Sequence, residues 1–244
     1  MSSDEPSLVE LAQVFADDLT TRVQTVVPGS VPFTAKVVPE RSVVSVKQEP
    51  GDGIVLTVDG KPHLLLKVSF RCSFDGHSRF LAVDSSRVHV FASVSPGQPL
   101  FRYEYERRAS QVPAAHIQIH AHRDALTYVM TKSGAGTRRG RRRSDSEQVP
   151  LMQDLHFPVG GHRFRPALED VLEMLIDEFG IDDAKDAREA LHVGRQAWRQ
   201  TQTKSAVRDD PQSAVEVLRQ LGYEVDWRGG GEEPQSRLDR LQAL

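Results

Sequence analysis

The chain has 244 residues, of which 39% are hydrophobic and 27% charged, so it is too apolar for general disorder and long enough to bury a substantial core. Its formal net charge is −3. No run approaches the roughly 20 apolar residues of a membrane span, and the acidic N-terminus does not resemble a signal peptide. These features exclude a helical membrane protein, and we expect a soluble, cytoplasmic protein without a membrane partner.

The first predicted element is an amphipathic helix that ends near Val23. Ser7 and Glu10 form an S-x-x-E capping box, and apolar residues then recur at helical spacing up to Leu19.

The next part of the chain has the period of strands. Seven short runs are β-branched or alternate between apolar and polar residues: Phe33–Val38, Ser42–Lys47, Ile54–Val58, His63–Phe70, Arg79–Asp84, Val88–Ser93 and Leu100–Glu106. Turn signals separate them, of which Asp59-Gly60 is the strongest and Asp84-Ser85-Ser86 is another. Since the connections leave no room for crossover helices, we predict an antiparallel β-meander within an α+β fold.

A strand over Ala114–Arg123 and a helical piece over Ala125–Thr131 complete a first unit, residues 1–131. The segment 132–150, rich in Gly, Ser and Arg, is long for a loop, and we predict that it is flexible. Residues 151–227 are then expected to pack on the sheet, and 228–244 to form a polar tail with one more short helix. Their predicted elements are a return strand at Leu155–Pro158, helices from Pro166 to Gly180, Ala184 to Thr203 and from Pro211, and a strand at Tyr223–Trp227.

The only cysteine, Cys72, lies in an apolar run, so an intramolecular disulfide and a paired thiolate metal site are excluded. We expect it to be a buried, unreactive side chain. Charge is unevenly distributed: residues 101–143 carry ten bases and three acids, and residues 164–190 carry three bases and nine acids. Either a basic face binds an anion, or the two segments pair with each other.

The strand Ala114–Arg123 has the most informative pattern, A-A-H-I-Q-I-H-A-H-R. Alternation puts Ile117 and Ile119 on one face, which we expect to be buried, and three histidines with Gln118 on the other. Such a face is either a structural ladder of polar groups or a functional site.

Two chemistries remain open for these histidines. Without a cofactor, imidazoles with neighbouring cationic and phenolic groups can supply the base, the acid and the charge stabiliser of phosphodiester cleavage. The candidate catalytic residues are His116, His120, His122, Arg102, Tyr103 and Arg123. Alternatively, His120-x-His122 has a spacing that metal-binding β folds use, and His156 can complete a divalent metal site.

Two further segments carry cations. Five arginines in the long loop form a candidate nucleic-acid-binding arm: Arg138, Arg139, Arg141, Arg142 and Arg143. The segment 157–166 mixes Phe, His and Arg directly before a predicted helix, and such a turn either holds an anion or simply connects a strand to a helix.

Residues 81–179 resemble TumE-type toxin proteins and related bacterial domains of unknown function. The resemblance lies in Phe101-Arg102-Tyr103-Glu104-Tyr105, the histidine-bearing strand and the helix that follows Arg163 to Pro166. It implies a toxin-like activity directed at RNA, with an antitoxin-like protein as partner. The alternative is a non-enzymatic interaction module of a mobile-element or defence system that binds a partner protein through its C-terminal helices.

Overall fold

The computed structural model describes residues 6–38, 42–51, 53–75, 80–94, 97–108, 114–119, 124–137, 140–141 and 165–241. The helices are α1 (Leu8–Val26), α2 (Asp124–Lys132), α4 (Leu168–Phe179), α5 (Ala187–Asp209), α6 (Pro211–Gln220) and α7 (Leu238–Leu241). The strands are β1 (Phe33–Val37), β2 (Val44–Gln48), β3 (Ile54–Val58), β4 (Lys61–Phe74), β5 (Leu81–Ala92), β6 (Phe101–Glu106) and β7 (Ala115–Ile119). The α+β class is confirmed, and within the described residues no helix is long and apolar enough to cross a membrane.

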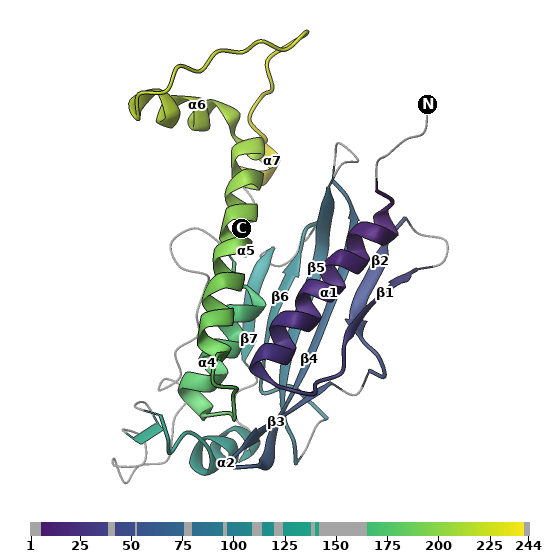
Figure 1. Cartoon of the computed structure of the whole chain (residues 1–244), viewed down its shortest axis with the longest axis vertical. Coiled ribbons are helices and arrows are strands. Elements are labelled where there is room, and N and C mark those ends of the chain that lie inside the picture. The colour runs from purple at the N-terminus through teal and green to yellow at the C-terminus, as the bar shows by residue number, and fades with distance from the viewer. Residues whose placement is uncertain are drawn as a thin grey trace.

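The seven strands form one antiparallel sheet. Six of them follow the order β1-β2-β4-β5-β6-β7, and β3 pairs with β4 beside this path. One edge of β4 pairs with β3 along its first half and with β2 along its second half, while β5 pairs with the other edge over nearly its whole length. The predicted meander is therefore confirmed, and β4 is the long central strand (Figure 1).

Local signals account for the two best-predicted features. Ser7 and Glu10 make the expected capping box, in which the Glu10 carboxylate accepts the Ser7 N–H at 2.7 Å. Asp59 and Gly60 have φ angles of 51° and 71° and form the turn between β3 and β4. The Asp182 carboxylate accepts both turn N–H groups, at 2.9 and 2.8 Å, and so attaches this turn to the segment after α4.

The predicted turn at Asp84-Ser85-Ser86 is wrong, because β5 runs through it without a break. The pairing with β4 shifts there: Arg71 lies opposite Ser85, whereas Cys72 lies opposite Val83. Asp84 is thus the additional residue of a β-bulge, and its carboxylate accepts a hydrogen bond from Arg107 at 3.3 Å.

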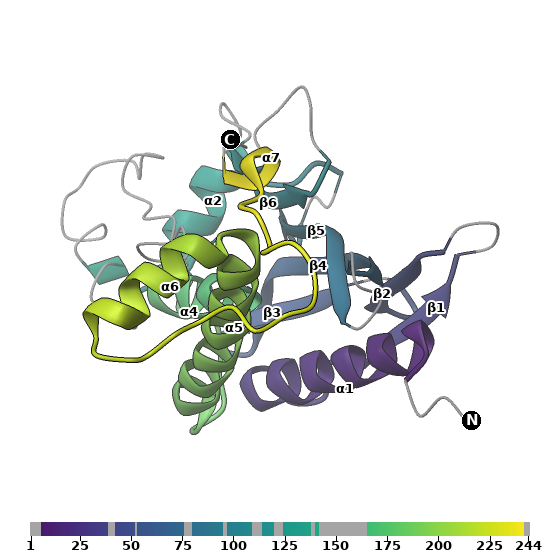
Figure 2. The same cartoon turned by 90° about the horizontal axis from the view of Figure 1, so that it is seen from above.

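One face of the sheet is covered by α1, α4 and α5 (Figure 2) and forms the core with them. Alternate residues of β4 from Leu64 to Cys72 point into this core. Phe101 of β6 stacks on Phe179 of α4, with 6.5 Å between the ring centres. Cys72 is fully buried as predicted, and burial, aided by the charge of Asp84, raises the pKa of its thiol to about 12. The residues that alternate with these core residues therefore point to the opposite side of the sheet, which we call the outer face.

The C-terminal helices depart slightly from their predicted bounds. α4 begins two residues after Pro166 and ends at Gly180, whose φ of 63° is the left-handed value expected of a helix-ending glycine. A Cβ on Gly180 would lie 3.3 Å from the Cα of Gly134. The described start of the segment 132–150 therefore packs against the end of α4, while residues 138–139 and 142–150 and the predicted return strand lie outside the described residues.

The predicted strand at Tyr223–Trp227 is also wrong, because this segment is irregular and pairs with no described strand. It lies far from the sheet, in a projection that we call the C-terminal arm, residues 211–237 (Figure 1). Asp210 closes the base of the arm by accepting hydrogen bonds from the hydroxyls of Ser213 and Ser236. The expected short helix in the tail is present as α7.

Candidate functional site on the outer face of the sheet

The outer face carries the polar residues that alternate with the core residues of each strand. Lys67, His89, Arg102 and Gln118 lie side by side across β4, β5, β6 and β7. The adjacent row contains Ser69, Arg87, Glu104 and His116. Since Lys67 and Arg87 are exposed, this part of the face presents cations around a single carboxylate.

Glu104 connects the two rows. Its Oε1 lies 2.9 Å from Nε2 of His89 and 3.7 Å from an amino group of Arg102, and its Oε2 lies 3.4 Å from Nε2 of His116. These four side chains are 14–31% exposed, and we call them the Glu104 cluster. One carboxylate therefore orients two imidazoles that come from different strands.

The electrostatics assign the proton between His89 and Glu104. Burial, together with the charges of Arg102 and Arg87, lowers the pKa of His89 more than the hydrogen bond and charge of Glu104 raise it. Burial acts to raise the pKa of Glu104, but the His89 hydrogen bond and the charges of Arg102 and the two histidines lower it overall. A neutral His89 beside an ionised carboxylate must donate from Nε2, which leaves a lone pair on Nδ1.

Two buried polar atoms, one in the cluster and one beside it, have no hydrogen-bond partner among the described residues. They are Nε of Arg102 and Oε1 of Gln118, which lie on directly paired residues of β6 and β7. Buried polar atoms are normally satisfied, so this pair is a place where a polar ligand atom would be stabilised.

Two predicted site residues, His116 and Arg102, belong to the cluster, whereas Tyr103 does not. Tyr103 points into the core, where burial, together with the charge of Asp170, raises its pKa. Ile117 packs against the core as expected, but Ile119 is 37% exposed because β7 is the last strand of the described sheet. The prediction that Ile119 is buried is therefore wrong.

Several predicted residues lie outside the described residues: His120, His122, Arg123, His156, Arg138, Arg139, Arg142 and Arg143. Arg141 is described, is exposed, and donates a hydrogen bond to the carbonyl of Gly136 at 3.0 Å. Within the described part of the chain, no three His, Cys, Asp or Glu side chains can hold a metal ion together. The three predicted metal ligands, His120, His122 and His156, all lie outside this part, so the metal site stays a prediction.

Sequence reasoning missed His89 and Glu104. The signal for His89 was present in the alternation Arg87-x-His89 within a predicted strand, and Glu104 stood between two residues that were singled out. Their importance depends on strand order and register, because His89 and Glu104 are 15 residues apart and His116 is 12 residues further on.

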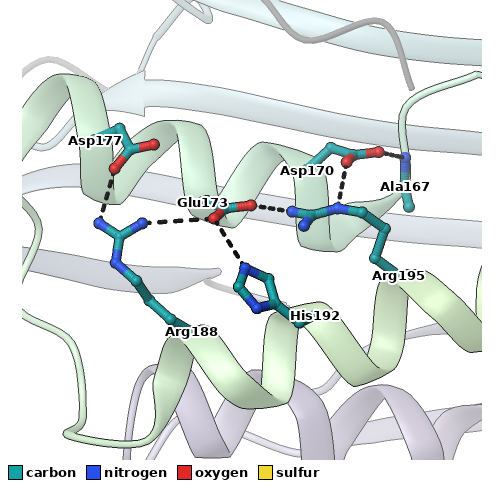
Figure 3. A network of polar contacts seen from close by, with 7 residues as sticks. All are labelled: Ala167, Asp170, Glu173, Asp177, Arg188, His192 and Arg195. Atoms are coloured by element: carbon teal, nitrogen blue, oxygen red, sulfur yellow. Dashed lines mark hydrogen bonds and ion pairs between the residues drawn. The ribbon is translucent and has the colours of Figure 1, made fainter. Parts of the chain in front are cut away.

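A second polar cluster joins α4 to α5 (Figure 3). Arg195 donates to Asp170 at 2.8 Å and pairs with Glu173, while Asp170 also accepts the N–H of Ala167 at 2.8 Å. At the other end, Arg188 pairs with Asp177 at 2.7 Å. The acidic members of the cluster lie on α4 and the basic members on α5, so the cluster attaches α5 to α4.

The exposed side of α5 continues this cluster into a groove of about 780 Å³. Four of its lining residues can carry positive charge: His192, Arg195, Arg199 and Lys204. Beyond the groove, α6 has no buried residue, and several apolar side chains of the arm are exposed: Val217, Leu218, Leu221, Tyr223 and Trp227. The helical layer thus offers two surfaces of different character.

Comparisons of the chain with known protein families, with curated proteins and with solved structures found no match.

Proposed function

We propose that the protein acts on RNA, binding its phosphates on the outer face and cleaving a phosphodiester with the two histidines of the Glu104 cluster. The observation that carries the proposal is the contact of one ionised carboxylate with two imidazoles on a face that also presents Lys67 and Arg87. The resemblance of residues 81–179 to TumE-type toxins points in the same direction.

The chemistry needs no cofactor. Nδ1 of His89 would take the proton of a ribose 2′-hydroxyl, whose oxygen attacks the phosphorus and forms a 2′,3′-cyclic phosphate. A protonated His116 would donate a proton to the departing 5′-oxygen, so that atoms and protons balance. Lys67 and Arg102, on either side of His89 in the same row, would stabilise the additional negative charge on the phosphate.

The test is incubation of purified protein with a labelled oligoribonucleotide in the presence of EDTA. We expect cleavage with a cyclic phosphate end, and a loss of about 100-fold or more in rate for His89→Ala and His116→Ala, because general acid–base groups contribute on this scale. The double variant Lys67→Ala, Arg87→Ala should weaken binding and reduce its dependence on salt. The matched histidine control is His63→Ala, since His63 lies near the start of β4, four residues before Lys67.

Intact RNA with the wild type, or equal cleavage rates in the wild type, His89→Ala, His116→Ala and His63→Ala, would contradict the proposal.

A second candidate function is favoured by the arm. A helix without any buried residue, followed by exposed Tyr223 and Trp227, is typical of a surface that binds another protein. The arm carries five acids and two bases over residues 211–233, so a partner with basic residues around an apolar patch fits it best. Co-expression with the product of a small neighbouring reading frame tests this candidate, with Leu218→Glu, Leu221→Glu expected to abolish a complex on size-exclusion chromatography.

A further inference from the structure

Arg165, just before α4, lies in contact with two aromatic rings. Its guanidinium carbon is 4.0 Å from the ring centre of Tyr105 in β6 and 4.7 Å from that of Trp198 in α5. Cation–π contacts of this kind hold the guanidinium in place without using its N–H groups as donors to oxygen. Elements far apart in sequence therefore position one cation on the helical side of the sheet.

This cation has no anionic partner in the described part of the chain. No carboxylate pairs with Arg165 there and no oxygen accepts from it, although the residue is partly buried and its pKa is lowered by burial, against a smaller effect of Tyr105. A partly buried charge is costly without a partner, so arginines in such places are normally paired.

Trp198 adds a second unused donor. Its Nε1 is buried and has no hydrogen-bond partner, and Trp Nε1–H can only donate. Two donors without acceptors thus belong to side chains that touch each other. Buried polar groups of a folded protein are satisfied in the great majority of cases, so the two donors fit an oxygen atom that the described residues do not supply.

We propose that Arg165 and Nε1 of Trp198 bind a phosphate group. The planar fork of a guanidinium matches phosphate and carboxylate oxygens alike. The geometry favours phosphate: the guanidinium lies over the Trp198 ring whereas Nε1–H lies in the plane of that ring, and the four oxygens of a phosphate point in different directions while the two of a carboxylate lie in one plane.

The site is separate from the Glu104 cluster, because Tyr105 alternates with Glu104 along β6 and therefore points to the opposite side of the sheet. The proposal does not depend on RNA cleavage. The phosphate can belong to a small phosphate compound or to a phosphodiester, and the two sources are distinguished by the probes used.

The experiment is a fluorescence titration in a Trp227→Phe background, which leaves Trp198 as the only tryptophan. The probes are inorganic phosphate, acetate and an oligoribonucleotide without terminal phosphates, with KCl at equal ionic strength as reference. We expect a saturable change with phosphate that KCl does not produce and that acetate produces at 10-fold or higher concentration. A response to the oligoribonucleotide alone would assign the phosphodiester as the ligand.

Arg165→Met keeps an unbranched apolar stem and should abolish the response. Arg208→Met is the matched control. Arg208, in the last turn of α5, also lies over an aromatic ring, because its guanidinium carbon is 4.5 Å from the ring centre of Phe80. If Arg165→Met does not fold, Trp198→Phe keeps the stacking and removes the donor, and it should lose most of the increase in melting temperature that phosphate gives the wild type.

An equal response to acetate, a response that persists in Arg165→Met, or no response beyond that to KCl would overturn the proposal.

Discussion

His89 of β5 and Glu104 of β6 are diagonal neighbours on the outer face of the sheet, with Nε2 and Oε1 2.9 Å apart. The burial of His89 makes stability depend on pH. Burial lowers the pKa of His89 below its usual value of about 6.5, which the unfolded chain retains. A group of this kind contributes stability at pH values above 6.5, and that contribution is lost as the pH falls through the folded-state pKa.

We therefore expect the free energy of unfolding, measured with urea, to decrease between pH 7.5 and 5.5, and to decrease less in His89→Gln. Glu104→Gln should lower the pKa of His89 still further. Since it removes a hydrogen bond and a charge that raise the pKa of His89, the imidazole should titrate at lower pH in NMR spectra. The same pH dependence in wild type and His89→Gln would contradict this reading.

The contact of Asp182 with the β3–β4 turn should contribute measurably to stability. Its two carboxylate oxygens accept the N–H groups of Asp59 and Gly60. Hydrogen bonds from the Thr57 side chain and from these two N–H groups hold the pKa of Asp182 below its usual value. Because the group is exposed, we expect Asp182→Ala to lower the free energy of unfolding by only about 1 kcal/mol. Asp183→Ala, which removes the adjacent carboxylate without these bonds, should change it by less than about 0.5 kcal/mol. Equal effects in urea denaturation would show that the turn contact is not stabilising.

The two arginines that attach α5 to α4 differ in how deeply they are buried. Arg195 is 15% exposed and its partner Asp170 is 7% exposed, whereas Arg188 and Asp177 are 48% and 43% exposed. Removing one partner of a buried pair leaves an uncompensated charge, so Arg195→Met should cost about 3 kcal/mol. Arg188→Met should cost less than about 1 kcal/mol, as exposed pairs do. A cost for Arg188→Met as large as that for Arg195→Met would contradict this ranking.

The arm should be dispensable for folding. Leu218 and Leu221 are 37% and 69% exposed, so the double variant Leu218→Glu, Leu221→Glu should change the free energy of unfolding by less than about 1 kcal/mol in total. Leu172→Ala, at a residue that is 1% exposed in the core, should cost about 3 kcal/mol. Destabilisation by the arm variant comparable with that of Leu172→Ala would mean that the arm packs on the fold.

The sequence by itself determined the α+β class, the antiparallel sheet and the start of α1. These features depend on neighbouring residues: a capping box between Ser7 and Glu10, a positive-φ pair at Asp59-Gly60, and alternation with a period of two. The alternation also assigned His116 and Gln118 to the face opposite Ile117, since side chains of a strand point alternately to its two sides.

Only the tertiary structure decided which residues meet. Strand register brings His89 and His116 to the carboxylate of Glu104. The long pairing of β4 with β5 continues through Asp84, so this residue forms a β-bulge instead of the predicted turn. The tertiary structure also places Arg165 against Tyr105 and Trp198. Local patterns report the conformation and the exposed side of a segment, but they do not contain the register between segments, which is set by the packing of the whole core.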